Sequence, residues 1–433
     1  MASPRTLLVT GAAGAGRSTV AAATAAAAAR AGAAVLLLTA DADAAARLLP
    51  AAPGSEDGDG SAPADDTRTP GTSPVTGLPL PYPADGVDGL YVAVIDPAAS
   101  FRAEALNLQG RIGALLGLLG AAPLDPEELT ELPGSEALAL LRALRETHPE
   151  HAAAPPPPGA GGSTTWDLVV ADLPPVPDAI RTLALPGQLR RYLWRLLPED
   201  RQAARALRPV LAQLAGVPMP AEWAYDAAAR ADQELAAVQA VIEDAGTSVA
   251  VVLEPGPGAA DRLRTARTGL ALYGLRPTAV AANRLLPEGS ADPFLAALAG
   301  RQRTHLDELA AQCAADGVPL HELPHLGPDA AADGQLALPA APVAARRAAG
   351  DPWTVTDLLA DEGHFVWTLP LPGATRRGLD LVRRGDELVV DAGGFRRILP
   401  LPSALRRCTV SGAALRDGEL RVRFTPDPDL WPR

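Results

Sequence analysis

Residues 6–19 read TLLVTGAAGAGRST: a short β-forming run, a loop with three glycines and the start of an alanine-rich helix. The pattern predicts a strand over residues 6–10, a loop over 11–16 and a helix over 18–31. The apolar run at 35–38 follows as a buried parallel strand, which completes one right-handed βαβ unit. This unit decides the fold class, because such units build parallel α/β sheets.

The loop has the spacing of a phosphate-binding loop, except that Arg17 stands where lysine is usual. Glycines let backbone N–H groups converge on phosphate oxygens, and the helix start adds a positive dipole end. Ser18 supplies a hydroxyl of the kind that binds Mg²⁺ in such loops. The predicted nucleotide-binding residues in this segment are Gly11, Gly14, Ala15, Gly16, Arg17, Ser18 and Thr19. The alternative is a glycine-rich turn in an α/β fold that binds no nucleotide.

Arg17 keeps a positive charge but not the shape of lysine, because its planar fork is longer than an ammonium group. The chain contains no lysine at all, so the replacement reflects either drift under a compositional bias or a change of chemistry. Backbone amides supply much of the phosphate cradle. We therefore expect the replacement to affect catalysis more than binding.

Further strands alternate with helical patterns through the first three quarters of the chain, which predicts a doubly wound, mostly parallel α/β domain over residues 1–326. A helical subdomain is expected within it at 101–146 and 186–245, with a turn near Pro218. Low-complexity segments at 51–86 and 152–163 are expected to be disordered insertions. The expected strands cover residues 90–95, 166–171, 249–253, 278–282 and 318–323.

The composition changes after a Pro- and Ala-rich linker at 327–352. Six short β runs separated by turn pairs predict a small all-β sandwich over residues 353–433. We place these strands at residues 366–369, 379–383, 387–391, 396–399, 404–410 and 420–424.

The formal net charge of −13 disfavours nucleic acid and anionic lipid as partners. The N-terminal apolar run breaks into the glycine loop within a few residues, and the alanine stretch that follows is too weakly hydrophobic for a membrane span. The two cysteines, Cys313 and Cys408, are too few and too far apart in sequence for a disulfide framework or a paired-thiol zinc site. A cytoplasmic protein without stable membrane insertion is the expectation.

With the loop placed, the chain resembles the arsenite-transport and tail-anchored-protein-targeting ATPase family. That family begins with a deviant Walker A loop of the form G-K-G-G-V-G-K-T-T. The three glycines and Thr19 match it, and Ser18 keeps the hydroxyl. Ala12 and Arg17 replace the two family lysines that touch phosphate. The resemblance implies ATP and Mg²⁺ as cofactors.

Three single residues take roles from this resemblance. Asp41, in the segment TADA at 39–42, would orient the attacking water as the catalytic residue, although a helix cap is the simpler interpretation. Asp172, which ends the segment WDLVVAD at 166–172, would hold Mg²⁺ through water. Asn283 would read the adenine base, although an asparagine after a strand is more often a turn residue.

The C-terminal segments LPLPG at 369–373, GDELVV at 385–390 and RRILPLP at 396–402 resemble the α-crystallin-like, small heat-shock-protein domain found in some bacterial members of the family. Such a sandwich is either an interaction module or a passive cap.

Three functions stay open from the sequence. The first is an ATPase that acts as a homodimer, or as a heterodimer with a related ATPase, and couples nucleotide state to a protein client. The second is a degenerate, non-hydrolysing paralogue that regulates an intact ATPase. The third is a chaperone-like binding module.

Overall fold

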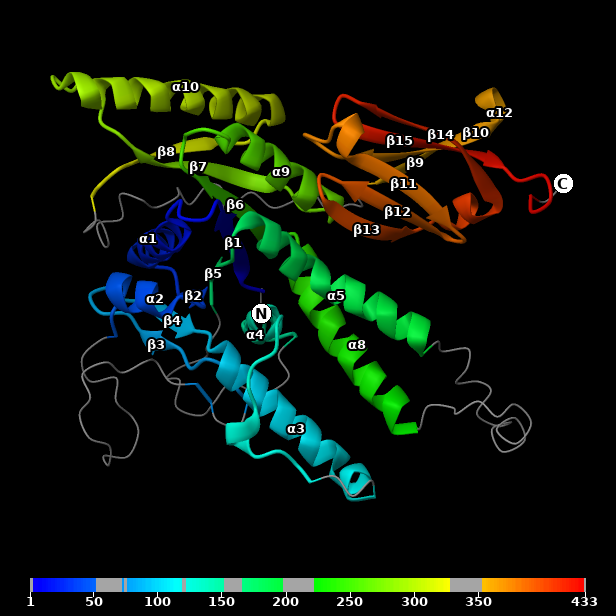
Figure 1. Cartoon of the computed structure of the whole chain (residues 1–433), viewed down its shortest axis with the longest axis horizontal. Helices are drawn as coiled ribbons and strands as arrows, with labels where there is room; N and C mark the ends of the chain where they lie inside the picture. Colours follow the sequence, from blue (N-terminus) through cyan, green and yellow to red (C-terminus); the bar gives the residue numbers. More distant parts are fainter. Residues whose placement is uncertain are drawn as a thin grey trace. The chain divides into compact units, whose positions relative to one another are not determined.

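The computed structural model describes residues 3–51, 72–73, 76–118, 122–151, 166–197, 222–327 and 353–431. Its largest element is an eight-stranded sheet with the order β3-β4-β2-β5-β1-β6-β7-β8 (Figure 1). The β2–β4, β1–β6, β6–β7 and β7–β8 pairs are parallel, and β3–β4 is antiparallel. The predicted mostly parallel α/β sheet is therefore confirmed.

The chain divides into two compact units, and both are discontinuous in sequence. The first consists of Met1–Pro4, Ala33–Val169 and Arg181–Asp244, and the second of Arg5–Gly32, Val170–Ile180 and Ala245–Arg433. The C-terminal sandwich belongs to the second unit, together with the glycine loop. The boundaries that we expect near residues 326 and 353 stay a prediction.

The first unit contains an edge of the sheet and a set of long helices. Its helices α3 and α4 pack on each other, as do α4 and α8. Helix α5 and strand β5 each begin in one unit and end in the other. The elements are β2 (Val35–Thr39), α2 (Ala42–Leu48), β3 (Tyr82–Pro83), β4 (Leu90–Val94), α3 (Pro97–Leu118), α4 (Ser135–Glu146), β5 (Leu168–Asp172), α5 (Val176–Leu196) and α8 (Glu222–Glu243).

The second unit starts with the glycine loop between β1 and α1 and continues through alternating strands and helices. Strands β1 and β6 are buried almost throughout, as expected for interior strands of a parallel sheet. The elements are β1 (Arg5–Gly11), α1 (Arg17–Arg30), β6 (Thr247–Leu253), α9 (Ala259–Leu272), β7 (Pro277–Leu285), α10 (Pro293–Asp316) and β8 (Leu320–Pro324).

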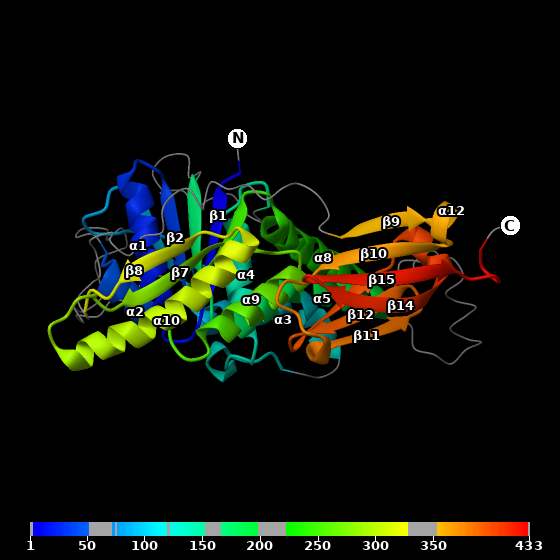
Figure 2. The same cartoon turned by 90° about the horizontal axis from the view of Figure 1, so that it is seen from above.

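The C-terminal residues form two antiparallel sheets, β14-β15-β10-β9 and β11-β12-β13, which confirms the predicted sandwich (Figure 2). Along β15, Leu420, Val422 and Phe424 are fully buried while Arg421 and Arg423 are exposed, the period-two pattern of a half-buried strand. The strands are β9 (Thr354–Leu358), β10 (His364–Pro370), β11 (Leu379–Arg384), β12 (Glu387–Ala392), β13 (Phe395–Pro400), β14 (Cys408–Arg416) and β15 (Glu419–Pro426), with a short helix α12 (Leu359–Glu362).

The sandwich packs on α9 of the sheet region. Thr268 Oγ1 donates to the Pro372 carbonyl at 2.8 Å, and Tyr273 Oη donates to the Arg396 carbonyl at 2.8 Å. A Cβ added at Gly269 would lie 2.7 Å from the ring of Phe395, so the two surfaces meet at van der Waals distance. The sandwich is thus part of the second unit because of specific contacts with α9.

Several predicted boundaries were wrong. Helix α5 begins ten residues before the predicted 186 and carries Pro186 inside it, where a proline removes a backbone hydrogen bond. Strand β9 was missed, and the predicted strand at 404–410 starts as a 3₁₀ turn (Ser403–Arg407) followed by the longer β14. Strand β3 forms inside the segment 51–86, which was expected to be disordered. The described residues leave out most of that segment, as well as residues 152–163 and the predicted turn near Pro218.

Candidate functional site

The candidate site begins where β1 ends and the chain turns into the glycine loop. The Ala12 N–H donates to the Val252 carbonyl of β6 at 2.9 Å. A Cβ added at Gly11 would lie 1.9 Å from that same carbonyl oxygen, so a side chain at position 11 would push the loop off the sheet. Glycine is therefore required at position 11 by the close approach of β6.

The loop itself depends on two glycines in the left-handed region. Gly14 has φ +75° and Gly16 has φ +82°, and α1 begins directly after Gly16, one residue before the predicted start. No side chain caps the first turn of α1, and this turn holds no acidic residue. Its N–H groups and dipole end are thus available to an anion, as the sequence predicts.

Arg17 folds back onto the end of β5. Its Nη1 donates to the Leu173 carbonyl and lies 4.0 Å from Oδ1 of Asp172. The Leu173 N–H in turn donates to the Val9 carbonyl at 2.8 Å, which ties this segment to β1. The side chains are 18% and 6% exposed, so this electrostatic contact is shielded from solvent. The structure thereby brings together two predicted site residues, the cation of the loop and the predicted metal carboxylate.

Asn283 lies beneath the loop, near the end of β7. Its Nδ2 donates to the Ala15 carbonyl at 2.8 Å, and its Oδ1 is buried without a hydrogen-bond partner among the described residues. The side chain is 3% exposed. Asn283 therefore supports the loop and keeps one acceptor without a described partner, and it lies within β7 rather than in a turn after the strand.

Asp41 is the N-cap of α2 in the first unit. Its Oδ1 accepts the Ala44 N–H at 2.8 Å, and the Asp41 N–H donates to Thr39 Oγ1 at 3.1 Å. The side chain is exposed. The capping interpretation of Asp41 is therefore realised, and its catalytic role stays a prediction. Ser18 and Thr19 are half-buried in the first turn of α1, where the sequence places them.

Sequence reasoning missed a pocket that follows Asn283 along the chain. It has a volume of about 380 Å³ and lies between the ends of β7 and β8 and the helix α10. Its walls combine the apolar Leu285, Leu286, Leu306 and Pro324 with the amide of Gln302 and with the charged side chains of Glu288, Arg303 and Glu322. Gln302 Nε2 donates to the Arg284 carbonyl at 3.0 Å, while its Oε1 accepts the Leu286 N–H at 2.8 Å. The apolar pair Leu285 and Leu286, where β7 ends, was the available sequence signal.

The parallel sheet, and the glycine loop that leads from its β1 into α1, define the class of P-loop-type α/β proteins. Residues 84–326 match the family model described as anion-transporting ATPase, and residues 362–424 match the HSP20-like domain found in ArsA. The chain belongs to the anion-transporting ATPase family. The matched region begins after the glycine loop, so the loop itself rests on its geometry and spacing.

Relatives of the chain support this assignment. The protein SCO2128 of Streptomyces coelicolor is 50% identical over 430 residues, which cover 99% of each chain. Protein Rv2184c of Mycobacterium tuberculosis is 32% identical over 71% of this chain and 72% of its own length. A putative arsenical pump-driving ATPase of Aquifex aeolicus is 24% identical over 37% of this chain and 38% of its own. Within the described residues, every helix is too short or too polar to cross a membrane.

Proposed function

We propose that this chain binds ATP with Mg²⁺ at the loop Gly11–Thr19, as a deviant Walker A site, and couples its nucleotide state to a client or a partner subunit. The observation that carries this proposal is the loop geometry. Two left-handed glycines lead into a helix whose first turn carries no acidic residue or side-chain cap. Such a cradle favours a phosphate chain, because converging N–H groups and the helix dipole both stabilise negative charge.

The remaining residues fit a nucleotide by their chemistry. The Ser18 hydroxyl would be one Mg²⁺ ligand, and Asp172 would hold the ion through water. The unused Oδ1 of Asn283 would accept a hydrogen bond from the base, and the pocket between β7, β8 and α10 has the size and mixed lining that suit a flat heterocycle. Asp41 would orient the attacking water, which requires it to leave or share its helix cap. Mg²⁺ would neutralise charge that develops on the phosphates.

A specific observation favours a second function, a non-hydrolysing paralogue that regulates a related ATPase. Ala12 carries no charge, and the guanidinium of Arg17 is held by the Leu173 carbonyl beside Asp172. Charge neutralisation is a major part of phosphoryl-transfer catalysis. A loop whose cation stays on β5 would hold a nucleotide through backbone amides and leave the reaction slow.

Two measurements separate these functions. Isothermal titration with ATP and ADP, with and without Mg²⁺, tests binding, and saturable Mg²⁺-dependent binding is expected for both. Phosphate release then distinguishes them. An active ATPase loses turnover in Asp41→Asn, whereas a degenerate paralogue shows no turnover until Ala12→Lys and Arg17→Lys are combined. If neither ATP nor ADP binds at millimolar concentration, where a binding free energy of only about −4 kcal/mol would be detected, both functions are refuted.

The same proposal includes assembly into a homodimer or a heterodimer with a related ATPase. It places the protein in the cytoplasm, where ATP is available. Light scattering with and without nucleotide tests the assembly, and a monomer under both conditions contradicts it.

A further inference from the structure

The outer face of the four-stranded sheet of the sandwich carries a row of cations. On β15, Arg421 and Arg423 alternate with buried residues of the core, and Arg416 ends the neighbouring strand β14. We call these three arginines the basic face. Within the part of the chain that the structure describes, the guanidinium groups of Arg416 and Arg423 make no hydrogen bond or ion pair, while that of Arg421 donates to Glu419 Oε2 at 2.7 and 3.1 Å.

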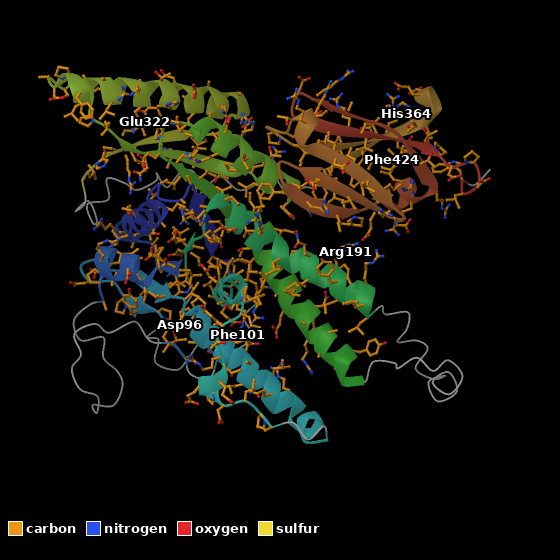
Figure 3. The ribbon with its side chains drawn as sticks, in the orientation of Figure 1. Asp96, Phe101, Arg191, Glu322, His364 and Phe424 are labelled. Carbon is orange, nitrogen blue, oxygen red and sulfur yellow. The ribbon has the colours of Figure 1, made fainter. Side chains whose placement is uncertain are left out.

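Short side chains flank this row on both sides. Arg423 lies opposite Gly412 of β14 and Val366 of β10, and Arg421 lies opposite Ala414 and Thr368. The result is a groove of about 610 Å³ whose lining also includes His364, Glu362 and β9 residues. Figure 3 shows His364 at the start of β10 and Phe424 on β15 within the sandwich. The lining residues that the structure describes therefore combine the three arginines with uncharged residues and a single carboxylate, that of Glu362.

Charge complementarity indicates the chemistry of the occupant. Residues 353–433 carry 12 arginines and 11 acidic residues, a formal charge of +1, and so the remaining residues carry −14. An exposed carboxylate on a partner would find in the basic face the guanidinium of Arg423, which the described part of the chain leaves unused, and that of Arg421, whose partner is the 40% exposed side chain of Glu419. A long polyanion such as nucleic acid would extend beyond this small face and meet the acidic remainder.

The spacing indicates the shape of the occupant. Arg421 and Arg423 point from the same face of one strand, and residues two apart on a strand are separated by about 6.8 Å. Acidic residues at alternate positions of an extended peptide have the same separation. We propose that the basic face binds an extended acidic segment of a partner protein, with carboxylates at every second residue paired to Arg421 and Arg423 and the backbone over Val366 and Thr368.

Fluorescence anisotropy with the full chain at low ionic strength tests this. The probes are a labelled peptide of alternating Glu and Thr, the same peptide with Gln for Glu, and a peptide of equal composition with its Glu residues in one block. We expect the alternating peptide to bind about tenfold more tightly than the other two, a difference of one unit in log Kd. Equal binding of the alternating and blocked peptides refutes the spacing argument and with it the proposal.

Two variants complete the test. The double variant Arg421→Gln, Arg423→Gln is expected to weaken binding of the alternating peptide about tenfold, because the charge-assisted hydrogen bonds to both carboxylates are lost. The matched control is Arg377→Gln, an exposed arginine of the same sandwich outside the groove, which should leave binding unchanged. An equal loss in the control, or equally tight binding of an oligonucleotide or of anionic lipid vesicles, overturns the proposal. Both substitutions lie on the surface, so nucleotide binding by the same preparations stays as in the wild type.

Discussion

Replacement of Gly16 by alanine should destabilise the protein in two ways, through the left-handed backbone conformation at position 16 and through a contact with Asn283. Gly16 has φ +82°, a conformation that costs an L-residue about 1–2 kcal/mol. Its new Cβ would also lie 2.5 Å from Nδ2 of Asn283, closer than a real contact allows. Asn283 would have to move, and its hydrogen bond to the Ala15 carbonyl is worth about 1 kcal/mol. The expected loss of unfolding free energy is therefore about 2–3 kcal/mol.

Gly14→Ala is the matched control for this prediction. Gly14 has a similar φ of +75°, but a Cβ there meets no atom within 4 Å. The Gly14→Ala variant should therefore lose only the unfolding free energy that the left-handed conformation costs, about 1–2 kcal/mol. Urea unfolding followed by circular dichroism measures both losses, and the difference between them isolates the contact with Asn283.

A double-mutant cycle sharpens the test. In an Asn283→Ala background the clash is gone, so Gly16→Ala and Gly14→Ala should cost nearly the same. If Gly16→Ala costs no more than Gly14→Ala in the wild-type background, Asn283 does not support the loop as described, and the argument from its position fails.

Three further predictions concern the packing and titration of buried groups. Phe395→Ala should lower the unfolding free energy by about 3–5 kcal/mol, because Phe395 is 7% exposed and packs on α9. In the same urea titration, the control Val382→Ala on the sandwich surface should change the unfolding free energy by less than about 0.5 kcal/mol. Burial raises the pKa of Cys313 from 9.0 to about 11, so its thiol should react with iodoacetamide only on unfolding. Its contribution to the unfolding free energy, up to about 3 kcal/mol, is complete below pH 9 and is lost as the pH rises toward 11. The Cys313→Ala variant should show a smaller loss of stability over this pH range. Burial lowers the pKa of His148, so its neutral form stabilises the fold above pH 6.5, and the unfolding free energy should fall as acid protonates the ring. If a His148→Gln variant loses unfolding free energy with falling pH as steeply as the wild type, this prediction is contradicted.

The family assignment and the glycine loop rest on different parts of the chain. The match to the anion-transporting ATPase family starts at residue 84, after the loop. The loop is supported by Gly11, Gly14 and Gly16, each of which has a distinct structural requirement. Nucleotide binding and hydrolysis therefore have to be tested by experiments on the loop itself, and the variants of Ala12, Arg17 and Asp41 provide such a test.

The position of the sandwich on α9 has a consequence for those experiments. Arg397 Nη1 donates to the Leu272 carbonyl at 2.7 Å, and its guanidinium lies over the rings of Tyr273 and Trp353. Removal of residues 353–433 would expose this surface of α9, in the same unit as the loop. Substitutions on the sandwich surface, rather than a deletion, are therefore the better test of whether it acts as an interaction module.

Local sequence was enough to predict the α/β class, the loop and the sandwich. Glycine spacing, apolar periods and turn pairs act over a few residues, so they can be read without the fold. The same local signals placed Asp172 at a strand end and Ser18 in the first turn of α1. They failed at Pro186, which lies inside α5 against its propensity, and at β9, an exposed edge strand that is paired with β10.

Tertiary structure alone decided how these residues are used. The contact of Arg17 with the Leu173 carbonyl joins residues 156 positions apart, and the bond from Asn283 to Ala15 joins residues 268 apart. The pocket beyond Asn283 and the basic face of β15 likewise combine separate strands. Strand order and packing set the side-chain partners across such separations, and no local pattern encodes them. The sequence therefore identified the candidate residues of the site, whereas the fold determined their partners.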